Sequence, residues 1–213
     1  MNRYKWINLF YALIFMFVLI CIATCVVLFT KQIYYFDINY LHITDYVNLS
    51  VEKIKENYNV LIHYQSFLYK GDLVFPDFIM SESGAKHFRE VKVVFEIMQY
   101  VALGGGLAGL ALAIKKYKDK DYQFFKSIAI TTFIVPLIIG FLASINFDRA
   151  FTLFHQIVFR NNDWLFNYRT DPIILILPED FFMHCFILII VVVWILCLIN
   201  YIIGKKLEKK WLS

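Results

Sequence analysis

The sequence predicts an all-α membrane protein with four transmembrane helices and a small extracytoplasmic cap. Of its 213 residues, 60% are hydrophobic, more than an ordinary soluble domain of this size contains. Four apolar segments carry the excess, at about residues 6–30, 93–114, 127–146 and 181–203. Each has about 20 residues or more, which as a helix crosses a hydrocarbon core of about 30 Å.

The first apolar segment is predicted to be retained as a membrane anchor. It follows a short basic start, as a signal peptide does, but it is longer than the usual apolar region of such a peptide. It also lacks a small-x-small cleavage site. Residues 1–213 are therefore expected to form a single integral membrane domain.

The distribution of basic residues predicts that both termini are cytoplasmic. The N-terminal tail carries Arg3 and Lys5, the connection between the second and third segments has five lysines, and the C-terminal tail has four. The connections 31–92 and 147–180 instead carry seven basic against eight acidic residues and three against five. Short basic loops stay in the cytoplasm, so both long connections should lie outside and form the cap. The net charge of +4 follows from this asymmetry and gives no indication of a nucleic-acid partner.

The secondary structure of the cap is only partly defined by its sequence pattern. Residues 46–58 have the apolar spacing of a short helix, whereas residues 60–69 fit a strand or a helix. The cap is therefore expected to be all-α or mixed α/β. Ser81 or Ser83 is a suitable N-cap for a helix that starts near Gly84 and continues into the second span.

The cysteines and glycines point to helix packing. All four cysteines lie in predicted spans, so no disulfide framework is expected in the outside connections. No spaced cluster of histidine and cysteine indicates a metal site, and we expect neither a metal nor an organic cofactor. Gly105 and Gly109, four residues apart in the second span, favour close approach of a neighbouring helix.

The histidines are the candidate catalytic residues. His155 follows Phe151 and precedes Phe159 at helical spacing of four residues, and His87 and Glu90 share a helix face. The predicted topology brings to the outer surface His87, Glu90, His155, Arg160, Asn161 and Asp163, with His184 as a further candidate.

Histidine is the side chain best suited to proton transfer near neutral pH. No serine lies in a nucleophile-elbow motif, and no cysteine lies outside the spans. A pair of histidines therefore fits better than a Ser-His-Asp triad. A histidine at a membrane edge is also a common hydrogen-bonded anchor, so the residues alone leave both interpretations open.

Three segments resemble the lipoprotein intramolecular transacylase family, Lit. They are SESGAKHFREVK, FDRAFTLFHQIVFRNNDW and LPEDFF, in this order on a four-span chain. The most specific element is Phe154-His155 followed by Phe159, Asn161 and Trp164. The family usually has aspartate at the position of Glu90.

The resemblance implies a bacterial membrane enzyme whose substrate is a diacylated lipoprotein. Such enzymes move the acyl chain from the glyceryl sn-2 oxygen of the N-terminal cysteine to the α-amino group of that cysteine. The product is an N-acyl, S-monoacylglyceryl (lyso-form) lipoprotein. This places the active site at the outer leaflet of the cytoplasmic membrane, in contact with membrane lipid. His155 and His87 are the implied catalytic pair, and the candidate supporting residues are Phe151, Phe159, Glu90, Arg160, Asn161 and Trp164.

The chemistry of an amine nucleophile agrees with this implication. An α-amino group has a pKa of about 7.7 to 8.0, so a neutral imidazole can accept its proton. We assign the base to His155 and stabilisation of the oxyanion to His87, although on sequence the two roles are exchangeable. Two alternatives remain open: a phospholipase or phospholipid acyltransferase with the same histidines, and a non-enzymatic assembly or sensor protein.

Overall fold

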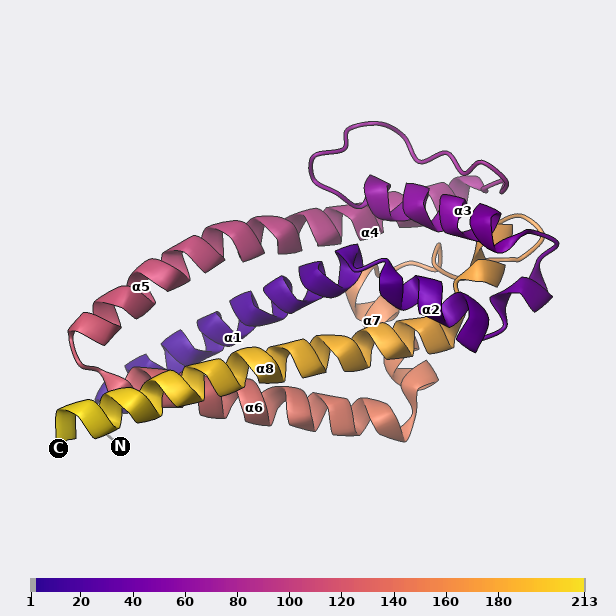
Figure 1. Cartoon of the computed structure of the whole chain (residues 1–213). Coiled ribbons are helices and arrows are strands. Elements are labelled where there is room, and N and C mark those ends of the chain that lie inside the picture. The colour runs from indigo at the N-terminus through magenta and orange to yellow at the C-terminus, as the bar shows by residue number, and fades with distance from the viewer. Residues whose placement is uncertain (1–2, 213) are drawn as a thin grey trace. The chain divides into compact units, whose positions relative to one another are not determined.

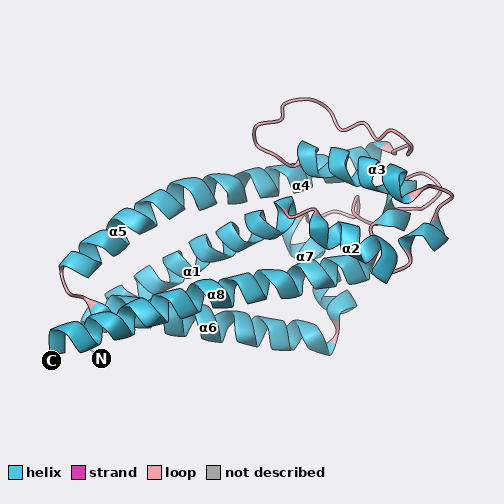
Figure 2. Ribbon diagram, in the orientation of Figure 1, coloured by secondary structure: helices cyan, strands magenta, loops and turns pink. Residues whose placement is uncertain are grey.

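The computed structural model describes residues 3–212, and every regular element among them is a helix (Figures 1 and 2). The basic side chains assigned to the N-terminal tail, at positions 3 and 5, lie outside the residues whose side chains are described. In chain order the elements are α1 (Arg3–Phe29), α2 (Gln32–Tyr40), η1 (Ile43–Tyr46), α3 (Val51–Tyr64), α4 (Glu82–Tyr100), η2 (Val101–Gly105), α5 (Gly106–Lys118), α6 (Tyr122–Ile145), α7 (Phe147–Val158), η3 (Pro172–Ile176) and α8 (Glu179–Leu212).

Four helices are long and apolar enough to cross a membrane, as predicted. They cover Trp6–Phe29, Glu82–Lys118, Tyr122–Ile145 and Glu179–Trp211. The second is continuous through α4, the π-helical turn η2 and α5. At 37 residues it is about 55 Å long, more than a hydrocarbon core requires. This length agrees with the expectation that the helix begins well before the span.

The described chain forms two compact units. Unit 1 comprises residues 3–25, 98–144 and 187–212, and unit 2 comprises Val26–Ile97 and Ile145–Phe186. Within unit 1, a Cβ added at Gly105 would lie 2.8 Å from Val18, and one added at Gly109 would lie 3.3 Å from Phe15. Close packing was predicted for these two glycines, and α1 is the neighbour that approaches them.

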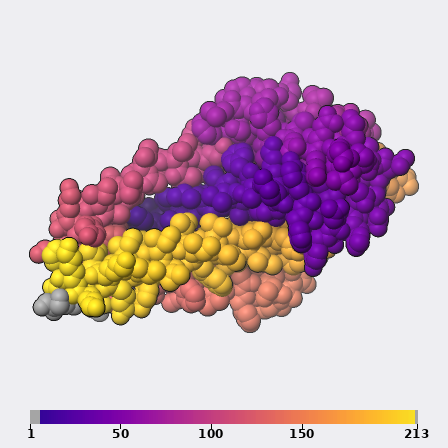
Figure 3. Space-filling view, in the orientation of Figure 1, coloured from indigo at the N-terminus to yellow at the C-terminus, as the bar shows by residue number. Residues whose placement is uncertain are grey.

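Unit 2 holds a core of its own, formed by α2, α3, the start of α4 and the segment 173–181. Its centre is Tyr34, whose ring stacks on Tyr58 at 3.7 Å and meets Phe181 edge-on at 5.1 Å. The Tyr34 hydroxyl donates a hydrogen bond of 2.7 Å to the buried carbonyl oxygen of Ile176. In the space-filling view the purple part of the chain, which contains α2 and α3, forms one continuous surface (Figure 3).

Of residues 60–69, for which a strand or a helix was considered, the first five are helical and the rest form a turn. Ser50 caps α3, its hydroxyl oxygen accepting from Lys53 N, and the helix continues to Tyr64. Six buried side chains line one face of α3, at the spacing of a helix: Ile54, Asn57, Tyr58, Leu61, Ile62 and Tyr64. Local propensity does not determine whether the residues after Val60 are helical. Burial of this face against the core stabilises the helix there. No strand occurs among residues 3–212, so the mixed α/β alternative for the cap is wrong within that range.

The hydrogen bond at the centre of unit 2 gives a first prediction. Tyr34→Phe removes the donor but keeps the ring, so the Ile176 carbonyl remains buried without its partner. We expect a loss of about 1–3 kcal/mol in unfolding free energy, measured as a lower melting temperature in detergent. The matched control is Tyr35→Phe, because Tyr35 donates an equally short bond of 2.7 Å, but to the half-buried Asn59 side chain. Equal effects of the two substitutions would contradict the account of the core.

Candidate active site

Helix α7 presents His155 on its buried face. Asn146 caps the helix by accepting a hydrogen bond of 2.8 Å from Arg149 N. The imidazole of His155 is only 8% exposed, whereas Leu153, Phe154 and Ile157 on the same helix are more than half exposed. The helix therefore has one face built around a histidine and another that is open and apolar.

Helix α4 brings His87 to the same place. His87 is 5% exposed, and its ring centroid lies 5.7 Å from that of His155. The sequence expectation that these two histidines come together thus agrees with the structure. Glu90 follows His87 one helical turn later on α4.

Aromatic side chains surround the two imidazoles. Phe151 lies 4.2 Å from the His155 ring and Trp164 lies 4.8 Å from it, between ring centroids. Phe159 touches both histidines, at 5.5 Å from His155 and 4.7 Å from His87. These three aromatic residues were among the predicted supporting residues. The two imidazoles therefore lie in an apolar environment.

The hydrogen bonding of His155 defines which nitrogen can act as a base. His155 Nδ1 lies 2.8 Å from the carbonyl oxygen of Phe151, one turn earlier on α7. Because a carbonyl oxygen only accepts, Nδ1 must carry the proton. In the neutral ring this leaves the lone pair on Nε2. Burial lowers the pKa of His155, and the bond to the Phe151 carbonyl partly opposes that shift. The neutral imidazole is therefore the favoured form near pH 7.

His87 lacks such an anchor. Its Nδ1 is buried, and within the described part of the chain it has no hydrogen-bond partner. A buried polar atom without a partner is uncommon and costs free energy unless a bound group supplies the missing bond. The hydrogen-bonding capacity of this nitrogen is thus unused within the described part of the chain.

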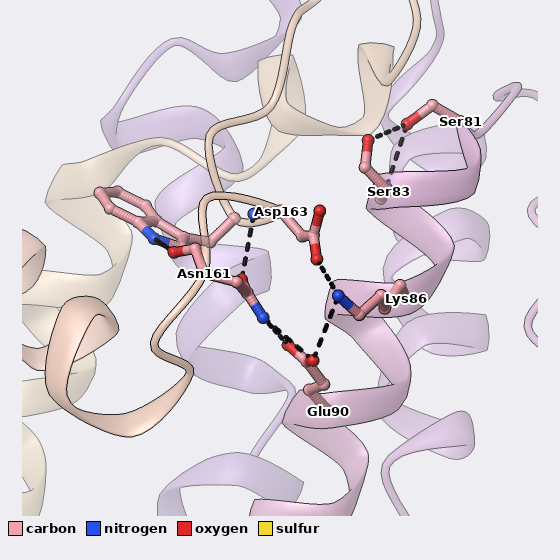
Figure 4. Close-up of polar contacts among 8 residues, drawn as sticks. Ser81, Ser83, Lys86, Glu90, Asn161 and Asp163 are labelled. Atoms are coloured by element: carbon pink, nitrogen blue, oxygen red, sulfur yellow. Dashed lines mark hydrogen bonds and ion pairs between the residues drawn. The ribbon is translucent and has the colours of Figure 1, made fainter.

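A network of polar side chains joins α4 to the loop after α7 (Figure 4). The Asn161 amide donates to both carboxylate oxygens of Glu90, each at 3.0 Å. Lys86 forms ion pairs with Asp163 at 2.5 Å and with Glu90 at 3.9 Å. The backbone carbonyl of Asn161 accepts a 2.9 Å hydrogen bond from Trp164 Nε1. A chain of contacts therefore runs from α4 through Asn161 and Trp164 to the ring of His155.

Arg160 does not join this network. Its backbone adopts a left-handed conformation with φ of 56°, and its side chain is exposed. This turn separates the end of α7 from Asn161.

His184 belongs to a different cluster. Its Nδ1 lies 3.0 Å from both carboxylate oxygens of Asp37, which is 1% exposed on α2. Phe182, two residues earlier on α8, contacts Phe151 of α7. Residues two apart on a helix do not share a face, so His184 lies on a different side of α8 from the one that contacts α7. The third histidine was a candidate for the site, but it bonds to an aspartate on α2.

The contacts of Phe166 and Lys86 in the site could not be predicted from the sequence pattern. Phe166 lies 5.5 Å from the His87 ring and 5.3 Å from Phe88, between ring centroids. Lys86 bridges two carboxylates, although its sequence neighbourhood suggests an ordinary exposed lysine. Both depend on how the loop after α7 runs along α4. Across the described residues, no group of three histidine, cysteine or acidic side chains has the arrangement of a metal site.

Comparison with known proteins identifies the family. The family model of the lipoprotein intramolecular transacylase Lit matches residues 9–182. The chain belongs to the Lit family. A search of curated proteins gives no match.

Solved structures of the Lit family agree in fold. The membrane-integral lipoprotein intramolecular transacylase Lit from Bacillus cereus is 35% identical, with a TM-score of 0.92 and 98% of each chain covered. A structure of the same protein with a histidine-to-arginine mutation is 35% identical with a TM-score of 0.86, covering 97% of this chain and 92% of that one. One with a histidine-to-alanine mutation has the same identity and TM-score, covering 98% and 96%. The chain is accordingly a multi-pass membrane protein and a lipoprotein intramolecular transacylase.

The burial of His155 gives a prediction for pH dependence. In the folded protein the pKa of His155 is lowered below its ordinary value of 6.5. At pH values between these two pKa values, the unfolded chain therefore binds more protons than the folded protein. The stabilisation from neutral His155 is therefore complete above pH 6.5 and is lost as the pH falls through the lowered pKa.

The measurement is the melting temperature in detergent from about pH 5 to pH 8, compared with that of His155→Gln. We expect the difference, unaltered protein minus variant, to grow with pH over the lower part of this range. The control is His63→Gln, which replaces an exposed histidine of the same unit and leaves the surroundings of His155 intact. A pH-independent difference for His155→Gln would contradict the buried neutral imidazole.

Proposed function

We propose that this Lit family member transfers the acyl chain on the glyceryl sn-2 oxygen of a diacylated lipoprotein to the α-amino group of the same N-terminal cysteine. The observation that carries the proposal is the pair of buried imidazoles with ring centroids 5.7 Å apart. One substrate supplies both nucleophile and ester, so the site mainly has to hold two reacting groups together. Such positioning is worth up to about 7–11 kcal/mol of a reaction barrier.

His155 is proposed as the general base. The amine attacks the ester carbonyl carbon, and a C–N bond forms while Nε2 of His155 accepts the N–H proton. The bond from Nδ1 to Phe151 keeps Nε2 free for this step and stabilises the imidazolium that results. This geometry supports His155 over His87 as the base, a choice that the sequence left open.

His87 is proposed to donate a hydrogen bond to the oxyanion and then to the departing oxygen. Two imidazolium ions so close together would repel each other, so His87 remains neutral while His155 carries the proton. Collapse of the tetrahedral intermediate breaks the bond between the carbonyl carbon and the sn-2 oxygen. The proton that His155 accepted from the amine then passes to that oxygen, which gives a secondary alcohol and an amide and returns His155 to its neutral form.

The aromatic surroundings serve to exclude water. Both imidazoles are buried, and Phe151, Phe159 and Trp164 pack against one or both of them. Water in this site would compete with the amine and release a free fatty acid. The bonds from Glu90 through Asn161 to Trp164 are proposed to hold the indole in place. Arg160, exposed beside them, is proposed to contact the substrate or the lipid headgroups.

The proposed setting is the cytoplasmic membrane of a bacterium. Residues 6–30, 93–114, 127–146 and 181–203 would lie in the bilayer, with both termini in the cytoplasm. The segments 31–92 and 147–180 would then form an extracytoplasmic cap with the active site at the outer leaflet. The whole chain is proposed to act as one integral membrane enzyme that meets its lipoprotein and membrane lipid there.

Replacement of His155 gives the test. His155→Ala should lower the conversion of diacylglyceryl to lyso-form lipoprotein by about 100-fold or more, because the variant lacks the proposed base for the amine proton. The measurement is mass spectrometry of the N-terminal lipopeptide, which reports whether the acyl chain is on oxygen or nitrogen. The control is His63→Ala, an exposed histidine of the same unit, which should convert normally.

Other outcomes would point to the alternative functions. Normal N-acylation by His155→Ala would contradict the proposed base. Released fatty acid with an unmodified amine would indicate a phospholipase or another lipid acyltransferase. An unchanged biological role after replacement of both histidines would indicate a non-enzymatic protein.

A further inference from the structure

A buried carboxylate lies at the start of the helix that carries His87. Asp171, in the loop between α7 and η3, is 2% exposed. Its Oδ1 accepts a hydrogen bond of 2.7 Å from Ser81 N, and its Oδ2 accepts one of 2.8 Å from the Ser81 hydroxyl. A third bond of 2.8 Å comes from the Thr170 hydroxyl. The carboxylate is therefore well satisfied without water.

Ser81 in turn forms the N-terminal cap of α4. Its hydroxyl oxygen accepts from Gly84 N at 3.0 Å, and its carbonyl oxygen accepts from Ala85 N at 2.9 Å. The hydroxyl that caps the helix is the same one that donates to Asp171. A negative charge at the N-terminus of a helix is also favourable, because the free backbone N–H groups point toward it.

Gly84 provides the space that Asp171 occupies. A Cβ at position 84 would overlap Asp171 Oδ1 and would lie 3.3 Å from the Phe166 ring. Gly84 is helical, and its φ does not call for glycine. The close approach of the carboxylate is therefore the reason that a side chain cannot be accommodated here.

The loop that ends at Asp171 contacts α4 at successive levels. Near the end of α7, Asn161 forms hydrogen bonds with Glu90, and Asp163 forms an ion pair with Lys86. Further along the loop, Phe166 packs on His87 and Phe88. At the end of the loop, Asp171 accepts hydrogen bonds from Ser81. Loop and helix thus run in opposite directions in fixed register. Asp171 fastens one end of this register, and the Glu90–Asn161 bonds fasten the other.

We propose that Asp171, acting through Ser81 and Gly84, is a positioning residue that sets the place of His87 opposite His155. The inference rests on the proposed function, since it concerns the geometry of that reaction. Asp171 touches neither imidazole in the described structure, so its effect passes through the first turn of α4. A misplacement of about 1 Å at a reacting group can cost about 100-fold in rate.

The test compares full-length variants purified in detergent. Asp171→Ala should lower kcat by about tenfold or more with KM changed by less than about threefold, because substrate contacts remain and the transition-state geometry does not. Asp171→Asn keeps an acceptor for Ser81 N and should recover part of the lost rate. The matched control is Asp77→Ala, since Asp77 bonds to Asn57 and so fixes a loop to α3 rather than to α4. That control should lower the melting temperature but leave kcat per folded molecule unchanged.

A second readout does not depend on activity. Diethyl pyrocarbonate modifies accessible imidazoles, and mass spectrometry locates the product. Asp171→Ala should raise the modification rate of the buried His87 several-fold while leaving that of the exposed His63 unchanged. Gly84→Ala should reproduce both effects in the parent protein but add little in the Asp171→Ala background, where its clash is removed.

The outcomes separate this inference from the proposed function. If the parent protein converts its substrate and Asp171→Ala retains kcat and His87 protection while folded, the positioning role is wrong. The same conclusion follows if activity falls only in proportion to the folded fraction, as for Asp77→Ala. If the parent protein performs no N-acylation, the proposed function fails, whereas the modification rates still report whether Asp171 positions His87.

Discussion

The hydrogen bond from His155 Nδ1 to the Phe151 carbonyl links the fold to the chemistry. It exists because helix α7 places a side chain four residues beyond a carbonyl that it can reach without leaving the helix. The bond settles the tautomer of a buried ring, so Nε2 is the basic nitrogen, and it orients that nitrogen away from its own helix. Burial then keeps the ring neutral, and a neutral ring is what a general base for an amine requires. The position of His155 in the helix, its burial and its protonation state are therefore linked.

The second imidazole is held by different means. His87 has no hydrogen bond at its buried Nδ1 in the described chain, so its position depends on the helix beneath it and on the rings of Phe159 and Phe166. Polar contacts on either side of it, from Glu90 to Asn161 and from Ser81 to Asp171, determine where α4 lies against the loop. His87 therefore owes its position to packing and to the polar contacts of its helix rather than to a hydrogen bond of its own.

The sequence predicted those features that follow from local pattern. Apolar length indicated four spans, spacing of four residues placed His155 between Phe151 and Phe159, and topology brought His87 to the same surface. Features that depend on register between distant segments could not be read from the sequence. The pairing of His184 with Asp37 joins residues 147 positions apart, and the bond from Asp171 to Ser81 joins residues 90 apart. The helical course of α3 beyond Val60 was equally undecided, because it depends on a face buried by tertiary contacts.

In the proposed reaction the α-amino group is the nucleophile, in a site closed to water. A synthetic diacylglyceryl lipopeptide with an isotope-labelled sn-2 chain tests it directly, in matched forms with a free and an N-acetylated terminus. Mass spectrometry follows the label after incubation with the full-length protein. The label should move to nitrogen in the free peptide and stay on oxygen in the acetylated one, without release of labelled fatty acid. Release of labelled fatty acid from the acetylated peptide, as fast as transfer in the free one, would contradict the proposed reaction.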